Sequence, residues 1–184
     1  MKIGKYLTIG AIALSLIATG AFAQDKAKQQ REVREKAQQS LNDFYKAEPK
    51  IKGEVQRAAG YAVFTTYGFS FLLGGSGGKG IVHDNKTKKT TYMDLAQASA
   101  GLQLGATKAR YLFVFKDEKT IQSFINSGWE AGVEGGAGAG AGKTSAGGTQ
   151  GDFTGGKVYS LTEKGLQGGG MVAGTKLWKD KDLN

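Results

Sequence analysis

The chain of 184 residues contains no cysteine, one proline and one histidine. Without cysteine there is no disulfide framework and no thiol nucleophile, so the fold must be held together by packing and backbone pairing. A single histidine also excludes most zinc sites, which draw on several histidine or cysteine ligands. No spaced pair of carboxylates points to acid–base chemistry. The sequence therefore predicts no catalytic residues, no metal site and no cofactor.

Long apolar runs are scarce as well, and the one clear example is residues 7–18 near the start. This run follows two lysines and leads into the small-x-small pattern at residues 21–23, as in cleavable secretion signals. It is also short for a membrane span of ~20 residues. We expect residues 1–23 to be a signal peptide cut after Ala23. The mature chain, residues 24–184, would then be one domain that is periplasmic or secreted.

The charge is strongly positive, with 25 lysine and arginine residues against 16 acidic ones and a net charge of +9. Such a surface favours anionic partners, which include acidic lipid headgroups, polyanionic glycans and nucleic acid. No motif in which aromatic and basic residues alternate accompanies the charge, and this argues against nucleic acid.

Apolar periodicity predicts helices first and strands afterwards. Residues 24–48 carry apolar side chains at three- to four-residue spacing, and Pro49, the only proline, ends that helix. A second short helix follows up to Gly60. From there β-branched and aromatic residues dominate, and residues 111–115 are apolar on both faces, as in a central strand. Asp117 is placed to cap a further helix.

Further strands are expected at residues 61–67, 69–73, 80–83, 90–95, 100–106, 158–161 and 166–178. We expect a glycine turn at residues 74–80 between two of them. Gly128 is expected to stop the helix that Asp117 begins. Eleven of the 25 residues from 132 to 156 are glycine, which predicts a mobile loop because little apolar surface is there to repay ordering.

Three segments resemble nucleotide-binding or catalytic motifs, but the residues around them do not predict the structure that each motif needs. Residues 75–80 fit G-x-G-x-x-G, but a strand pattern follows where the pyrophosphate would need a helix N-terminus. Residues 137–144 nearly fit a phosphate-binding loop, again with no helix after it. Residues 74–78 fit the G-x-S-x-G elbow, yet the sole histidine, His83, lies only a few residues on.

Several segments in order along the chain resemble the SYLF domain family: residues 59–64, 74–80, 99–105, 159–166 and 174–178. The resemblance extends over roughly residues 30–184. It implies a non-enzymatic lipid-binding module, because relatives bind phosphoinositides and other acidic membranes. A fungal branch of the family also binds actin, but the bacterial-type export signal argues against actin here.

These observations predict an α+β fold, with N-terminal helices packed on a strongly bent, largely antiparallel, barrel-like sheet. The predicted function is docking on anionic membrane surfaces. The candidate lipid-binding residues are Lys86, Lys88, Lys89, Lys108 and Arg110. Cations of the first helix would add to them: Lys26, Lys28, Arg31 and Arg34. The alternative is a structural or scaffolding envelope protein that binds a protein or cell-wall partner.

Overall fold

A computed structural model describes residues 9–69, 75–98, 109–130, 143–144, 151–162, 165–167 and 175–184, with side chains from residue 24 onward, strand ends excepted. Within these ranges the helices are α1 (Ile9–Ala47), α2 (Lys50–Arg57) and α3 (Glu118–Ser127). The strands are β1 (Gly60–Phe69), β2 (Gly75–Asp84), β3 (Thr90–Ala98), β4 (Arg110–Phe115), β5 (Trp129–Glu130), β6 (Lys143–Thr144), β7 (Gly151–Phe153), β8 (Gly156–Thr162), β9 (Gly165–Gln167) and β10 (Thr175–Lys179).

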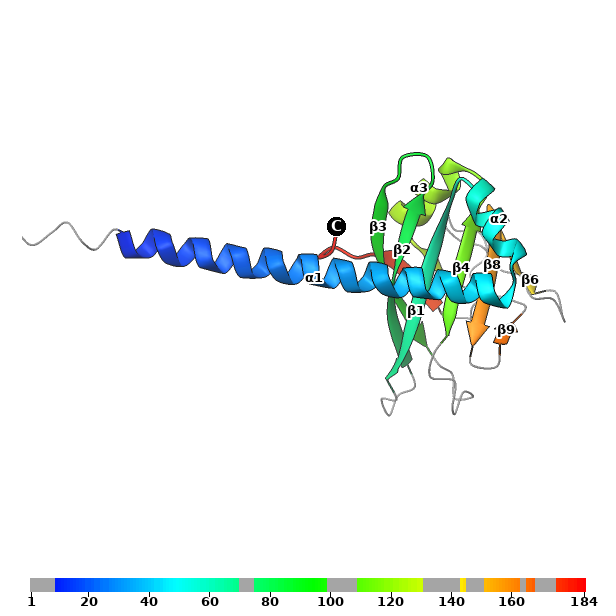
Figure 1. Ribbon diagram of the computed structural model, residues 1–184, viewed down its shortest axis with the longest axis horizontal. Helices are drawn as coiled ribbons and strands as arrows, with labels where there is room; N and C mark the ends of the chain where they lie inside the picture. Colours follow the sequence, from blue (N-terminus) through cyan, green and yellow to red (C-terminus); the bar gives the residue numbers. More distant parts are fainter. Residues whose placement is uncertain are drawn as a thin grey trace, which may run out of the picture.

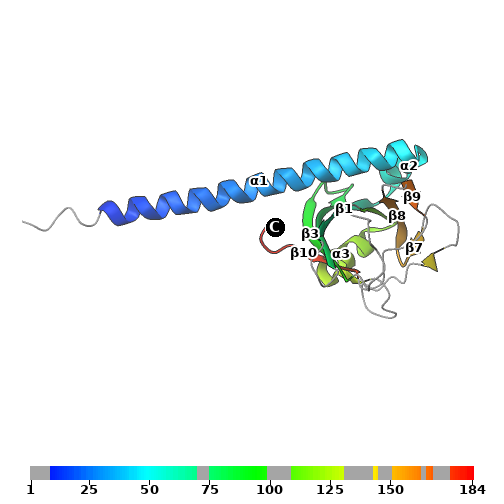
Figure 2. The same ribbon diagram turned by 90° about the horizontal axis from the view of Figure 1, so that it is seen from below.

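The strands form one antiparallel sheet in the order β5-β10-β3-β2-β1-β4-β8-β7-β6. Strand β9 also pairs with β8, on the same side as β7 but further along the strand. The sheet curls into a half-barrel around α3, while α1 and α2 lie across its opposite face (Figure 2). The predicted α+β fold with a strongly bent antiparallel sheet is confirmed.

Two apolar layers form because the central strands are apolar on both faces. In β4, Phe113 and Phe115 face α3, whereas Leu112 and Val114 face α1 and α2. The ring of Phe113 lies between 5.1 and 5.4 Å from those of Phe124, Trp129 and Phe153. The central position predicted for residues 111–115 is confirmed, with β1 on one side and β8 on the other.

The long first helix crosses the strands at a steep angle and extends well beyond β3 (Figure 1). Its apolar residues Val33, Ala37, Leu41 and Phe44 are buried against the sheet. The helix ends at Ala47, just before Pro49, as predicted. The cap of α3 is confirmed as well, because Asp117 Oδ1 accepts a 2.8 Å hydrogen bond from the Thr120 amide. Gly128, with φ of 72°, ends α3 as expected.

The predicted turn at residues 74–80 is wrong, because β2 begins at Gly75 and pairs along its length with β1 and β3. At two of the positions glycine is required because neighbouring backbone comes very close. A Cβ atom on Gly78 would lie 2.3 Å from the Thr65 carbonyl oxygen, and one on Gly80 would lie 2.2 Å from that of Val63.

The predicted loop at residues 132–156 is wrong at its end, where β7 pairs with β8 and Phe153 is buried in the core. Residues 143–144 also form the short strand β6. The rest of that loop and the strand predicted at residues 100–106 lie outside the described residues. In the stretch expected to be a strand at 166–178, β9 and β10 are described and residues 168–174 are not.

The expected signal peptide is described only in part. Residues 9–23 continue α1 toward the N-terminus as helical backbone, and residues 1–8 lie outside the described part. Among the described residues, no helix combines the length and the apolarity needed to cross a membrane.

Candidate anion-binding surface

Three of the predicted lipid-binding residues lie on the tight turn between β2 and β3. Asp84 Oδ1 accepts hydrogen bonds from the amides of Lys86 (2.8 Å) and Thr87 (3.0 Å). The bond from the Thr87 amide is the main cause that holds the pKa of the Asp84 carboxyl below its usual range. Because Asp84 fixes the backbone of the turn, the exposed side chains of Lys86, Lys88 and Lys89 project from a defined support.

Asn85 joins this turn to the end of α2. Its side-chain amide donates to the carbonyl oxygens of Val55 (2.8 Å) and Ala58 (3.0 Å), and its backbone amide donates to that of Ala59 (2.9 Å). These carbonyls belong to the last turn of α2 and the residues after it, which have no intrahelical partner. One side chain therefore sets the position of the lysine turn relative to the helix.

Strand register gathers further cations at the same end of the sheet. Gly60 pairs with Asp84 on one side and with Phe115 on the other, and Phe115 pairs with Gly156. The end of α2, the β2–β3 turn, the start of α3 and the start of β8 therefore meet there. We call this surface the basic end, defined by its seven cations: Arg57, Lys86, Lys88, Lys89, Lys116, Lys119 and Lys157.

Acidic groups only partly balance the basic end. Lys86 Nζ lies 3.4 Å from Glu118 Oε2, and Lys157 Nζ lies 3.2 Å from Glu54 Oε2. The other five cations make no ion pair with any residue that the structure describes. Counting the nearby carboxylates Glu54, Asp84, Asp117 and Glu118, the surface carries three more positive charges than negative ones.

A groove of about 620 Å³ opens into the basic end between α2 and the turn that joins β7 to β8. We call it the α2 groove; it is lined by Glu54, Arg57, Ala58, Val114, Phe115, Lys116, Phe153, Gly155, Gly156 and Lys157. Burial alone would raise the pKa of the Glu54 carboxyl. The hydrogen bonds from the Tyr159 hydroxyl (2.6 Å) and Lys157 Nζ outweigh burial, so the pKa lies below its ordinary value. Glu54 is therefore charged at neutral pH and holds Lys157 in place.

The structure does not bring Arg110 to this surface. Arg110 pairs with Thr65 at the opposite end of β4, five residues and thus roughly 17 Å from Phe115 along the strand. Its Nε atom lies 3.6 Å from Asp43 Oδ2 of α1. Arg110 therefore lies apart from the lysine turn, and a role for it in lipid binding stays a prediction. Lys108 lies outside the described residues.

The cations of the first helix lie on another face. Lys26 Nζ donates to the Asn184 carbonyl oxygen (2.8 Å), and the Arg34 guanidinium lies 5.9 Å from the centre of the Tyr92 ring. Lys28 and Arg31 are exposed there. In contrast, sequence reasoning missed four cations of the basic end: Arg57, Lys116, Lys119 and Lys157. They come from three segments far apart along the chain, and only the strand register brings these segments together.

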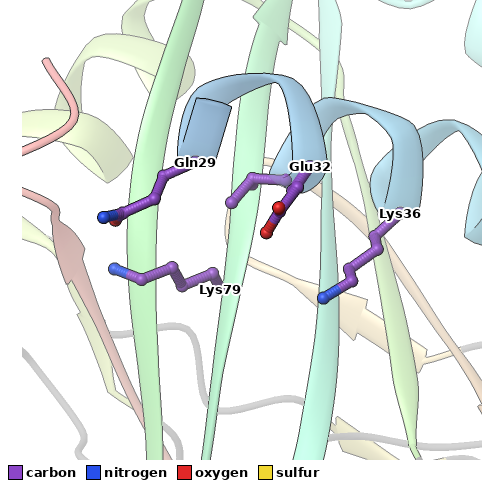
Figure 3. Close-up of a pocket in the computed structure, with 5 residues that line it drawn as sticks. Gln29, Glu32, Lys36 and Lys79 are labelled. Carbon is purple, nitrogen blue, oxygen red and sulfur yellow. The ribbon is translucent and has the colours of Figure 1, made fainter. Parts of the chain in front are cut away.

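A second, smaller cavity of about 170 Å³ lies between α1 and β2. Figure 3 shows Gln29, Glu32 and Lys36 of α1 above Lys79 of β2. Lys79 Nζ lies 2.7 Å from Asp94 Oδ1 and also forms an ion pair with Asp180. Its charge is therefore already balanced within the protein, and the basic end is the stronger candidate for an anionic ligand.

Comparison with known proteins places this architecture in a family. Residues 96–184 match the Ysc84 family model, which is described as Las17-binding protein actin regulator. Beta cell expansion factor A from Aeromonas veronii is 35% identical over 147 residues, which is 80% of the chain. The chain belongs to the SYLF family. It spans 56% of the length of the Aeromonas relative.

The SYLF family consists of non-catalytic domains. The SYLF family match begins within β3 and includes Lys116, Lys119 and Lys157 of the basic end. Arg57 and the lysine turn precede the matched residues. The surface is thus assembled from both halves of the chain.

Proposed function

We propose that this SYLF protein is a non-enzymatic lipid-binding module whose basic end docks on anionic membrane surfaces. The observation that carries the proposal is the convergence of seven cations from separate segments on one end of the sheet, five of them without an ion pair in the described part of the chain. Each cation held near an anionic bilayer contributes about 1 kcal/mol. Several together suffice for peripheral binding.

The packing of α1 supports electrostatic docking over apolar insertion. The residues that α1 would have to insert, Val33, Leu41 and Phe44, are at most 8% exposed because they cover the sheet. Insertion would require this helix to leave its place, at the cost of the buried apolar area. The exposed lysines need no such rearrangement.

The composition of the basic end favours lipid over nucleic acid. Proteins that bind single strands add aromatic platforms to their cations. Among the described residues, the exposed large hydrophobic residue is Trp178 of β10, which pairs with Asp94 of β3 and lies away from the basic end. We also propose that the protein acts outside the cytoplasm after loss of residues 1–23, and mature protein that begins at Gln24 would support this.

Vesicle sedimentation tests the lipid proposal. Changing Lys86, Lys88 and Lys89 together to Glu should lower binding to vesicles of phosphatidylcholine and phosphatidylserine by well over tenfold, because three contacts of about 1 kcal/mol each are replaced by repulsion. The matched control changes three exposed cations of α1, Lys28, Arg31 and Lys46, to Glu. This variant has the same net charge and should keep most of its binding.

Equal losses in the two variants would show that net charge alone governs binding, which contradicts the basic end as the docking surface. If the lysine-turn variant keeps its binding and the α1 variant loses it, the docking surface lies on α1 instead. If the parent chain does not bind the vesicles but captures a protein partner through the lysine turn, the scaffolding alternative replaces the lipid proposal.

A further inference from the structure

The α2 groove differs from the rest of the basic end because its cations surround a hollow. Arg57 comes from α2, Lys116 from the link between β4 and α3, and Lys157 from the start of β8. Val114 and Phe115 of β4 and Phe153 also line the groove. Glu54 is the one carboxylate among the lining residues, so these three cations give the groove a net charge of +2.

Two of the three cations have defined positions. Lys157 Nζ is held by Glu54, which is itself fixed by the Tyr159 hydroxyl at 2.6 Å. The Arg57 side chain lies back along α2, where a Cβ atom on Gly53 would be only 3.1 Å from its terminal nitrogen. Gly53 thus leaves room for the guanidinium beside the groove. Lys116 is exposed and anchored through its amide, which donates to the Gly155 carbonyl oxygen at 3.0 Å.

The wall opposite α2 is equally well defined. Gly155 has a φ of 111°, and a Cβ atom there would lie 2.3 Å from the Thr120 side chain. On Gly156 a Cβ atom would lie 2.0 Å from the Val114 carbonyl oxygen. The backbone of Gly155 and Gly156 therefore packs directly against α3 and β4, and this fixes the shape of the groove on that side.

We propose that the α2 groove is a binding site for one phosphate monoester group, held between Arg57, Lys116 and Lys157. An arginine fork can donate two parallel hydrogen bonds to a phosphate, and lysines add point charges from the sides. The size of the groove is in the range of small-ligand sites and leaves room for the group that carries the phosphate. The site rests on the proposed function, since it would let the docked surface select one headgroup.

The phosphate could belong to a lipid headgroup or to a soluble compound, and two measurements separate these sources. The first is titration of the full chain with inorganic phosphate, followed by the amide resonances of Gly155 and Gly156. The second is binding to vesicles that contain phosphatidic acid, a monoester, against phosphatidylserine vesicles of equal surface charge. A lipid source predicts a preference for phosphatidic acid, and a soluble source predicts phosphate binding without that preference.

Substitutions locate the site. Arg57→Gln and Lys116→Gln should each weaken phosphate binding about tenfold, since each removes a charge-assisted contact. Lys46→Gln, at an exposed lysine of α1 outside the groove, makes the same charge change and should alter phosphate binding less than twofold. Thermal midpoints of all three variants check that each is folded.

Equal weakening of phosphate binding by Lys46→Gln and Lys116→Gln would overturn the site, because the overall charge of the protein would then explain the binding. Absence of any phosphate-dependent shift, together with equal binding to the two lipids, would overturn it as well. Neither result affects the docking proposal, which fails separately if phosphatidylserine vesicles are not bound through the lysine turn.

Discussion

Individual glycines of β2 differ in what surrounds them. Gly80 lies so close to β1 that a Cβ atom would overlap the Val63 carbonyl oxygen and the Phe64 ring, whereas a Cβ atom on Gly77 would be 3.7 Å from its nearest neighbour. We expect Gly80→Ala to lower the free energy of unfolding by about 1–3 kcal/mol, the usual cost of overpacking. Gly77→Ala should change it by less than about 0.5 kcal/mol.

Urea denaturation of the two alanine variants measures this difference. Equal stability of both variants would mean that β1 and β2 can separate at little cost, contrary to the close register described for them.

Asn85 is the second residue whose role follows from its contacts. Its side chain serves two carbonyl oxygens at the end of α2, so Asn85→Ala should leave both without that partner. The expected loss of unfolding free energy is about 1–3 kcal/mol. Asn126→Ala, an exposed change on α3, is the control and should be nearly neutral. A neutral Asn85→Ala variant would show that water replaces the amide fully.

At the scale of elements, residues 180–184 join the first helix to the sheet. Asn184 Oδ1 accepts from the Tyr92 amide (3.0 Å), and its Nδ2 donates to the Tyr92 carbonyl oxygen (2.8 Å). Gln30 of α1 donates to the Leu183 carbonyl oxygen at 2.7 Å, and the Leu183 side chain is buried under α1. This segment therefore contacts both α1 and β3.

Acid pH should weaken this segment through Asp180. Burial alone would raise the pKa of its carboxyl, but hydrogen bonds from Lys79 and from the amides of Leu183 and Asp182 outweigh burial and lower the pKa. A carboxyl with a lowered pKa in the folded state stabilises the fold above its ordinary pKa of 3.8. That stability is lost as the pH falls through the folded pKa.

We therefore expect Asp180→Asn to lower the unfolding free energy at pH 7 and to reduce its decline below pH 4. Denaturation of both forms across this pH range measures the effect. Asp182→Asn, at an exposed carboxyl of the same segment, should leave the profile unchanged. If the unfolding free energies of Asp180→Asn and the parent chain fall in parallel below pH 4, groups other than Asp180 cause the loss of stability in acid.

An element can be predicted from the sequence when the residues that determine it are close together along the chain. This holds for the first helix with Pro49 at its end, the cap at Asp117 and the central strand. Each follows from apolar periodicity or from the chemistry of one residue, and all were predicted. Of the strand Gly75–Asp84, residues 80–83 were predicted and the glycine-rich first half was not. Gly78 and Gly80 are required by the close backbone of β1, and the local sequence does not show that contact. Phe153 was placed in a loop for a similar reason, since its burial comes from β4 and α3.

The same limit applies to the candidate site. Lys86, Lys88 and Lys89 are adjacent in sequence and were found as a cluster. Arg57 and Lys157 lie a hundred residues apart, and only the pairing of β4 with β1 and β8 brings them to one surface. The same register separates Arg110 from that surface.

For the whole molecule, the uneven charge distribution predicts a strong salt dependence. Exposed cations at the basic end act on a membrane over a screening length of ~8 Å at physiological ionic strength, which shrinks as salt rises. Binding to phosphatidylserine vesicles should therefore fall steeply with added salt. The variant with Glu at 86, 88 and 89 should show a much flatter dependence. Salt-independent binding by the parent chain would instead indicate apolar insertion.

The contacts of residues 180–184 also set an order of events in time. They join groups 153 and 158 residues apart, so they cannot form until nearly the whole described chain has been synthesised. Contacts this distant in sequence slow folding, because the loop between them must close first. During translation α1 emerges first, but it packs on β1, β2 and β4, which are made later, and its contacts with Leu183 and Asn184 form last. One of the earliest elements to be made is therefore among the last to be secured.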